Sequence, residues 1–149
     1  MNLPMSIRKF LPHREPMLMV DNIIKLGKDF IETTFDIQPS NIFLENNQFS
    51  EIGIIENAAQ TSSGIVGGPY FEANKSNKNF RVMGYISKIK SIEIYKLPSV
   101  NSQLSTKGEL LSMHQVGEVF SCEMRCFTYS NNEKIAESYF NLIIHPDKQ

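Results

Sequence analysis

Glu56 is the residue of this sequence whose surroundings point most directly to acid–base chemistry. It lies within residues 51–66, EIGIIENAAQTSSGIV, whose apolar residues recur at helical spacing on more than one face and predict a buried helix. Burying a carboxylate is costly because its charged form loses solvation, so such a glutamate can hold a proton near neutral pH and give it to a leaving group. Gln60 follows one helical turn later and is suited to orient the carboxylate.

A structural interpretation of Glu56 competes with the catalytic one. In this interpretation the glutamate lies on the one solvated stripe of the helix, which it shares with Asn57, Gln60 and Ser63. Polar side chains at helical spacing are typical of such a stripe. The composition of the segment leaves both interpretations open.

His13 is the second candidate for acid–base chemistry. It precedes Arg14 in a turn bracketed by Pro12 and Pro16, where a histidine is commonly just solvated or hydrogen-bonded. An imidazole titrates close to neutral pH and can accept a proton there. The other histidines have no such setting, because one lies in a polar stretch that reads as a turn and one is near the C-terminus, and we assign no role to His114 or His145.

No other motif in the sequence points to chemistry. The chain lacks a G-x-S-x-G nucleophile elbow, a phosphate-binding glycine loop and an H-E-x-x-H helix, and Ser62 and Ser63 are interpreted as small packing residues. Cys122 and Cys126 alternate with polar residues in a predicted strand, which is typical of buried core thiols. They are too far apart along a strand to form a disulfide and have no further ligands nearby, so we expect no metal site and no cofactor.

The size and charge of the chain restrict its class. Its 149 residues predict one domain spanning residues 1–149, and 15 basic against 16 acidic residues give a formal net charge of −1. This balance gives no electrostatic reason to expect a nucleic acid or an anionic membrane as partner. No apolar run is long enough to span a bilayer, and residues 1–10 lack the apolar region of a secretory signal. We therefore expect a cytoplasmic protein.

The order of the predicted elements indicates an α+β fold. The pattern predicts a hairpin of two strands, one buried helix with Ser50 as its N-cap, and then a long antiparallel meander. Residues 67–69, Gly-Gly-Pro, form a plausible helix stop, although the helix can continue over residues 70–73. The polar segments 39–47 and 74–79 are predicted loops, and residues 27–29 and 130–132 are predicted turns. The strands are predicted at residues 17–26, 30–37, 80–95, 100–113, 119–129 and 134–145.

A helix that is apolar all round must be wrapped by a curved sheet. We therefore expect one long central helix wrapped by an antiparallel sheet of about five or six strands. Because an open sheet of this length has edges that must be paired or guarded, we also expect a homodimer whose sheets join edge to edge.

Three segments of the chain carry a resemblance to a known family. Residues 10–21 read FLPHREPMLMVD, residues 51–64 contain IIENAAQTSSG, and residues 83–90 read MGYISKIK. In sequence and order they resemble the small hot-dog β-hydroxyacyl-acyl-carrier-protein dehydratases. The resemblance implies a hot-dog fold and the dehydration of a β-hydroxyacyl thioester to the trans-2-enoyl product, in fatty-acid or polyene-type biosynthesis. It also implies an acyl carrier protein or coenzyme A as the carrier of the substrate, and a dimer or a multiple of dimers with the acyl tunnel between subunits.

The resemblance suggests roles for individual residues. Glu56 corresponds to the family's glutamate and would be the acid, and His13 would be the base. Gln60 would contact the substrate, and the backbone N–H groups of Ile52 and Gly53 would polarise the thioester carbonyl. We expect His13 and Glu56 to converge on one apolar cavity, with one residue from each subunit.

One departure from the family's pattern is clear. The family's catalytic histidine lies in a G-H-F-P-G stretch before the helix, whereas residues 43–53, FLENNQFSEIG, contain no histidine. The shortened loop resembles that of the divergent dehydratases of aryl-polyene and flexirubin-type pathways. Two alternatives to a dehydratase stay open: a hot-dog thioesterase in which Glu56 activates water, and a non-catalytic subunit that binds acyl chains or pairs with an active homologue.

Overall fold

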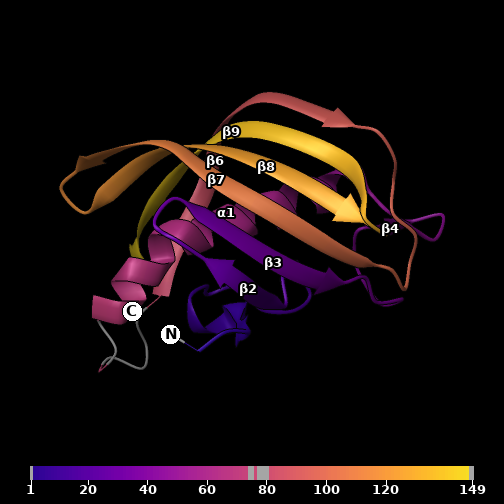
Figure 1. Cartoon of the computed structure of the whole chain (residues 1–149), viewed down its shortest axis with the longest axis horizontal. Helices are drawn as coiled ribbons and strands as arrows, with labels where there is room; N and C mark the ends of the chain where they lie inside the picture. Colours follow the sequence, from indigo (N-terminus) through magenta and orange to yellow (C-terminus); the bar gives the residue numbers. More distant parts are fainter. Residues whose placement is uncertain (1, 74–75, 77–80, 148–149) are drawn as a thin grey trace.

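The architecture is a single long helix lying along one face of a curved antiparallel sheet, as the computed structural model shows (Figure 1). The structure describes residues 2–73, 76 and 81–147. The helix is α1 (Glu51–Ala73), and a short 3-10 turn, η1, covers Ile7–Lys9. The main sheet has seven strands in the order β1-β2-β3-β7-β8-β9-β6. Its strands are β1 (Met5–Ser6), β2 (Asn22–Leu26), β3 (Phe30–Asp36), β6 (Arg81–Ile94), β7 (Gln103–Val116), β8 (Val119–Ser130) and β9 (Glu133–Asp147).

This arrangement confirms the predicted α+β fold with a central helix. The expected hairpin of the first two long strands is present as β2 and β3, and the meander is present as β7, β8 and β9. The sheet has more strands than expected because two-residue β1 adds to its edge beside β2. The predicted loop at residues 39–47 includes the start of a small second hairpin of β4 (Leu44–Glu45) and β5 (Gln48–Phe49).

The helix begins as predicted at Ser50. The carbonyl of Ser50 accepts from Ile54 N at 3.1 Å, and its hydroxyl accepts from Gly53 N at 3.4 Å. The helix does not end at residues 67–69. A Cβ on Gly67 would lie 2.8 Å from Cγ2 of Val82, so this glycine lets the helix approach the sheet instead of ending the helix.

Two element boundaries differ from the sequence prediction. The strand expected at residues 17–26 begins only at Asn22, and residues 17–20 run outside the sheet, whereas the N–H of Asp21 still donates to the carbonyl of Thr34 on β3 at 2.9 Å. The strand expected at residues 100–113 is β7, which continues to Val116, so His114 lies in this strand and not in a turn. The N-terminal end of the strand expected at residues 80–95 and most of the loop expected at residues 74–79 lie outside the described residues.

The inner face of the sheet forms the core with one side of the helix. Phe120, Cys122, Met124 and Cys126 of β8 alternate inward and are buried, as the period-two pattern predicts. Burial raises the pKa of Cys122 to about 11 and that of Cys126 to about 12. Both thiols are therefore buried core residues. In the part of the chain that the structure describes, no helix is both long and apolar enough to cross a membrane.

Candidate active site

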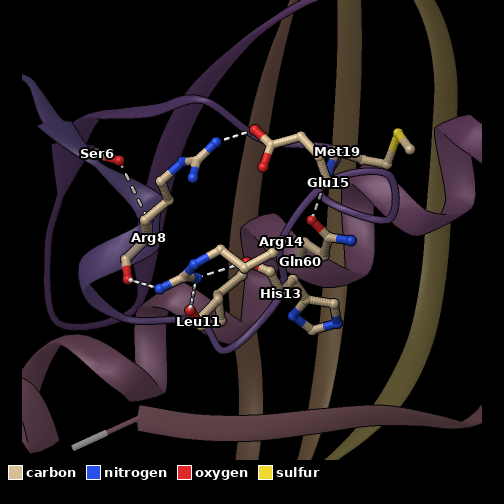
Figure 2. A network of polar contacts seen from close by, with 8 residues as sticks. All are labelled: Ser6, Arg8, Leu11, His13, Arg14, Glu15, Met19 and Gln60. Carbon is tan, nitrogen blue, oxygen red and sulfur yellow. Dashed lines mark hydrogen bonds and ion pairs between the residues drawn. The ribbon is translucent and has the colours of Figure 1, made fainter. Parts of the chain in front are cut away.

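His13 lies in a turn that is held together by the side chain of its neighbour. Nη1 of Arg14 donates to the carbonyl of His13 at 2.7 Å and to that of Leu11 at 3.0 Å (Figure 2). The carbonyl of Arg14 in turn accepts from the backbone N–H groups of Met17 and Leu18, at 3.0 and 3.1 Å. The turn is thus closed on both sides of His13, and local hydrogen bonds fix the backbone position from which the imidazole extends.

Glu56 lies on the second turn of α1, with its side chain 28% exposed. Its Oε1 accepts from Nε2 of Gln60 at 2.8 Å, as the spacing of four residues predicts. The carboxylate is therefore only partly buried. The alternative interpretation placed Glu56 on a solvated stripe of the helix together with three other polar residues. It is wrong for these three, because Asn57, Gln60 and Ser63 are 0%, 2% and 4% exposed.

The structure brings His13 and Glu56 together. Nε2 of His13 lies 4.0 Å from Oε1 of Glu56, and the His13 side chain is 24% exposed. Burial lowers the pKa of His13 below its ordinary value of 6.5, the Glu56 carboxylate opposes this effect, and the Arg14 guanidinium adds to it. The imidazole is therefore neutral near pH 7 and available to accept a proton.

Both side chains line a cavity of about 270 Å³ between α1 and the edge strand β6. On the strand side, a Cβ on Gly84 would lie 2.6 Å from Oγ of Ser63, so helix and strand approach closely there. The outer edge of β6 has no partner strand within the described part of the chain. The residues that line the cavity are His13, Glu56, Ala59, Gln60, Ser63, Gly84, Tyr85 and Ile86.

Two of the residues expected to contact the substrate do not line this cavity. The Ile52 side chain is 63% exposed, and Ile52 is absent from the cavity wall. Gly53 packs against the Phe49 ring, and its N–H group already donates to Ser50. The expectation that the backbone N–H groups of Ile52 and Gly53 polarise a thioester carbonyl stays a prediction, and neither residue lines the cavity shared by His13 and Glu56.

Gln60 does line the cavity, and its amide is also saturated with internal partners. Its Oε1 accepts from Met19 N at 2.8 Å (Figure 2). Its Nε2 donates both to the carbonyl of Met17 and to Glu56, each at 2.8 Å. Gln60 thus orients the Glu56 carboxylate rather than pointing a free amide at a substrate.

Sequence reasoning missed one wall of the cavity and one anchoring residue. The wall is formed by residues 84–86 of β6, which lie in the segment MGYISKIK that carries the resemblance but received no role in the predicted site. The anchor is Asn57, whose Nδ2 donates to the carbonyl of Met19 at 2.7 Å. The sequence did contain a sign of this role of Asn57, because a polar side chain on a buried helix needs a hydrogen-bond partner.

The other two histidines do not line the cavity, and one ring nitrogen of His13 has no hydrogen-bond partner within the described part of the chain. His114 is exposed on β7, and His145 on β9 shares a hydrogen bond with the hydroxyl of Tyr85. Nδ1 of His13 is buried and has no hydrogen-bond partner among the described residues, so no protein group fixes which ring nitrogen carries the proton. Among the same residues, no group of three or more His, Cys, Asp or Glu side chains could hold a metal ion.

Comparisons with solved structures support the fold. The chain is similar to the dehydratase heterocomplex ApeI:P from Xenorhabdus doucetiae, with a TM-score of 0.77 and 17% identity over 99% of this chain and 94% of that one. It is also similar to an uncharacterised protein from Pyrococcus horikoshii, with a TM-score of 0.63 and 13% identity over 95% and 93% of the two chains. A hypothetical thioesterase with coenzyme A from Streptococcus pneumoniae matches with a TM-score of 0.56 and 15% identity over 85% and 87%.

Comparison at the level of sequence identifies the family. No curated protein matches the sequence. The family model described as "ApeP-like: ApeP dehydratase" matches residues 5–149, which include the turn of His13, the whole of α1 and every long strand. The chain therefore belongs to the ApeP-like dehydratase family, and its fold is the hot-dog fold.

Proposed function

We propose that this protein dehydrates a β-hydroxyacyl thioester to the trans-2-enoyl thioester, with His13 as base and Glu56 as acid. The observation that carries the proposal is the 4.0 Å separation of His13 Nε2 and Glu56 Oε1 at one cavity. Dehydration needs a base for the C2 proton and an acid for the C3 hydroxyl, and these are the two groups at hand. The family assignment supports the reaction class.

The proposed step balances with these two residues. Nε2 of His13 takes a proton from C2, and the electrons of the C2–H bond form the C2=C3 double bond. The C3–O bond breaks as Glu56 protonates the departing hydroxyl, which leaves as water. Transfer of the proton from His13 back to Glu56 then restores both groups. The lowered pKa of His13 favours the neutral imidazole that the first step requires.

The separation of the two groups also predicts the stereochemistry. If an acid and a base lay on opposite sides of the C2–C3 bond, each would have to be within roughly 3 Å of the substrate, which is hydrogen-bond distance. With the substrate between them, the two groups would then be about 8 Å apart. At 4.0 Å, His13 and Glu56 lie on the same side. We therefore propose a syn elimination, which a substrate carrying deuterium at one defined C2 position tests.

The carrier and the partner subunit are part of the same proposal. The thioester would be presented by an acyl carrier protein or as a coenzyme A ester, in a fatty-acid or polyene-type pathway of the cytoplasm. The cavity borders strand β6, whose outer edge is unpaired in the described chain, and this supports a second hot-dog subunit beside it. We propose a homodimer or a multiple of dimers.

The direct test is turnover of β-hydroxyacyl thioesters by the purified protein, followed by mass spectrometry for loss of water. Glu56→Gln and His13→Asn should each lower kcat by about 100-fold or more, because each removes a proton-transfer group. Glu45→Gln is the control, because Glu45 is exposed on β4 and absent from the cavity wall. Release of free thiol without an enoyl product would instead identify a thioesterase. Tight binding without turnover would identify an acyl-binding subunit.

A further inference from the structure

We propose that Asn57 is a positioning residue of this site: it anchors residues 17–19, named here the strap, and the strap holds His13 and Glu56 at their separation. The inference deepens the proposed function and rests on it. It is carried by a continuous series of hydrogen bonds from the sheet, through Asn57 and the strap, to both acid–base groups.

Backbone groups of the strap form hydrogen bonds with side chains of α1 and, among the described residues, not with the backbone of a neighbouring strand. Asn57 Nδ2 donates to the carbonyl of Met19 at 2.7 Å, and Met19 N donates to Oε1 of Gln60 at 2.8 Å. Nε2 of Gln60 donates to the carbonyl of Met17 at 2.8 Å. Two amide side chains, one helical turn apart, thus bind three backbone groups of the strap. These bonds occupy backbone groups of Met17 and Met19, which precede the start of β2 at Asn22.

Glu56 is joined to the strap through Gln60. The same Nε2 atom that binds the carbonyl of Met17 also donates to Oε1 of Glu56 at 2.8 Å. Because Gln60 is 2% exposed and bonded at both ends of its amide, its position depends on the strap. A shift of the strap therefore moves or releases the donor that holds the Glu56 carboxylate.

His13 is joined to the strap through Arg14. The backbone N–H groups of Met17 and Leu18 both donate to the carbonyl of Arg14, and the Arg14 guanidinium donates to the carbonyl of His13 (Figure 2). The strap is therefore bonded towards both His13 and Glu56. Its position relative to α1 sets the distance between them.

Asn57 fixes the strap to the rigid part of the fold. Its side chain is fully buried, and its Oδ1 accepts from Oγ1 of Thr106 on β7 at 2.6 Å. A fully buried amide must have partners for its polar atoms, and here these partners are a central strand and the strap. Asn57 therefore connects the sheet to the site without itself lining the cavity.

Thr61 provides a matched control on the same helix. It is fully buried and shares a hydrogen bond of 2.7 Å with Thr33 of β3, but within the described part of the chain it has no hydrogen bond to the strap, and it does not line the cavity. Asn57→Leu and Thr61→Val each remove buried side-chain hydrogen bonds between α1 and the sheet. Only the first releases the strap.

The experiment compares these variants in the full chain by steady-state kinetics on a β-hydroxyacyl thioester and by NMR titration of His13. For Asn57→Leu we expect kcat to fall by about 10- to 100-fold with a much smaller change in KM, because misplacement affects the reaction step more than binding. We also expect the His13 titration to move up towards pH 6.5 as the imidazole becomes more solvated. Thr61→Val should leave both readouts close to those of the unmodified protein.

A second pair of variants covers the case in which Asn57→Leu does not fold. Thr106→Val removes the donor to Asn57 and should show the same changes to a smaller degree, whereas Thr106→Ser keeps the hydroxyl and should restore them. Equal effects of the Asn57 or Thr106→Val change and of Thr61→Val on kcat and on the His13 titration would overturn the proposal. If the thioester is not turned over but the His13 titration responds as expected, the proposed function fails and the positioning role stands.

Discussion

Nε2 of His13 and Oε1 of Glu56 lie 4.0 Å apart within one chain. The expectation that each subunit supplies one of the two groups is therefore wrong for this pair. The distance is too long for a direct hydrogen bond, so neither group is occupied by the other. A turn near the N-terminus and a buried helix thus bring a histidine and a glutamate together, although the loop before the helix contains no histidine.

The pH dependence of activity should report the environment of His13. Since the base must be neutral, activity is lost as pH falls through the pKa of His13 in the folded protein, which lies below 6.5. Arg14→Gln removes a positive charge that lowers this pKa, so the acid limb of kcat/KM should move to higher pH. Arg14→Lys keeps the charge and should leave the limb in place. A limb that moves equally in both variants would show that the hydrogen bonds of the turn, and not the charge, control the pKa.

Replacement of Gln60 should cost both stability and activity. Gln60→Leu leaves Met19 N and the carbonyl of Met17 without their partners in a buried region. Each unsatisfied buried group costs about 1–3 kcal/mol, so the free energy of unfolding in urea should fall by at least that amount. Turnover should fall as well, because Glu56 loses its donor. Gln103→Leu, which loses only an exposed contact to Asp36, is the control and should change neither quantity.

The close approach of Gly84 to Ser63 predicts a coupled pair of substitutions. Gly84→Ala places a methyl group 2.6 Å from Oγ of Ser63, so the chain should lose about 1–3 kcal/mol of stability through overpacking. Ser63→Ala in the same chain removes that oxygen and should recover much of the loss. Thermal melts of the two single variants and the double variant measure the coupling. Additive effects would contradict the described contact.

The open edge of β6 predicts self-association. Ile89 is 48% exposed on this strand, so Ile89→Asp should weaken a dimer formed through it. Val116→Asp is the control, because Val116 is 80% exposed at the end of β7, away from the β6 edge. Light scattering after size-exclusion chromatography compares the masses. A monomer at micromolar concentration for the unmodified protein would contradict the expected homodimer.

The two thiols should be unreactive in the folded state. Burial raises the pKa of Cys122 to about 11 and that of Cys126 to about 12, so little thiolate forms at pH 8 and access is blocked. A thiol reagent should therefore react with the folded protein much more slowly than with the protein in urea. Rapid reaction of a thiol without denaturant would show that the β8 core opens. Cys122→Ala and Cys126→Ala identify which thiol reacts.

The order of the elements could be predicted from the sequence because it depends on local patterns. Alternation of buried and exposed residues identifies β3 and β8, and all-round apolarity identifies α1. The contact of Gln60 with Glu56 follows from their spacing of one helical turn.

Other features depend on contacts between distant segments and were decided only by the tertiary structure. Residues 17–21 have the composition of a strand, but the amides of Asn57 and Gln60 bind backbone groups of Met17 and Met19 that a strand would pair. Residues 67–69 have the composition of a helix stop, but Gly67 serves close packing against Val82.

The same distinction holds for the site. The sequence by itself determined that Glu56 lies on a buried helix and that His13 lies in a proline-bracketed turn, because both follow from neighbouring residues. Only the tertiary structure decided that these two side chains meet and that residues 84–86 form a wall of the cavity. The physical reason is that local preferences specify elements, whereas the distance between two elements depends on the side chains that pack and bond between them.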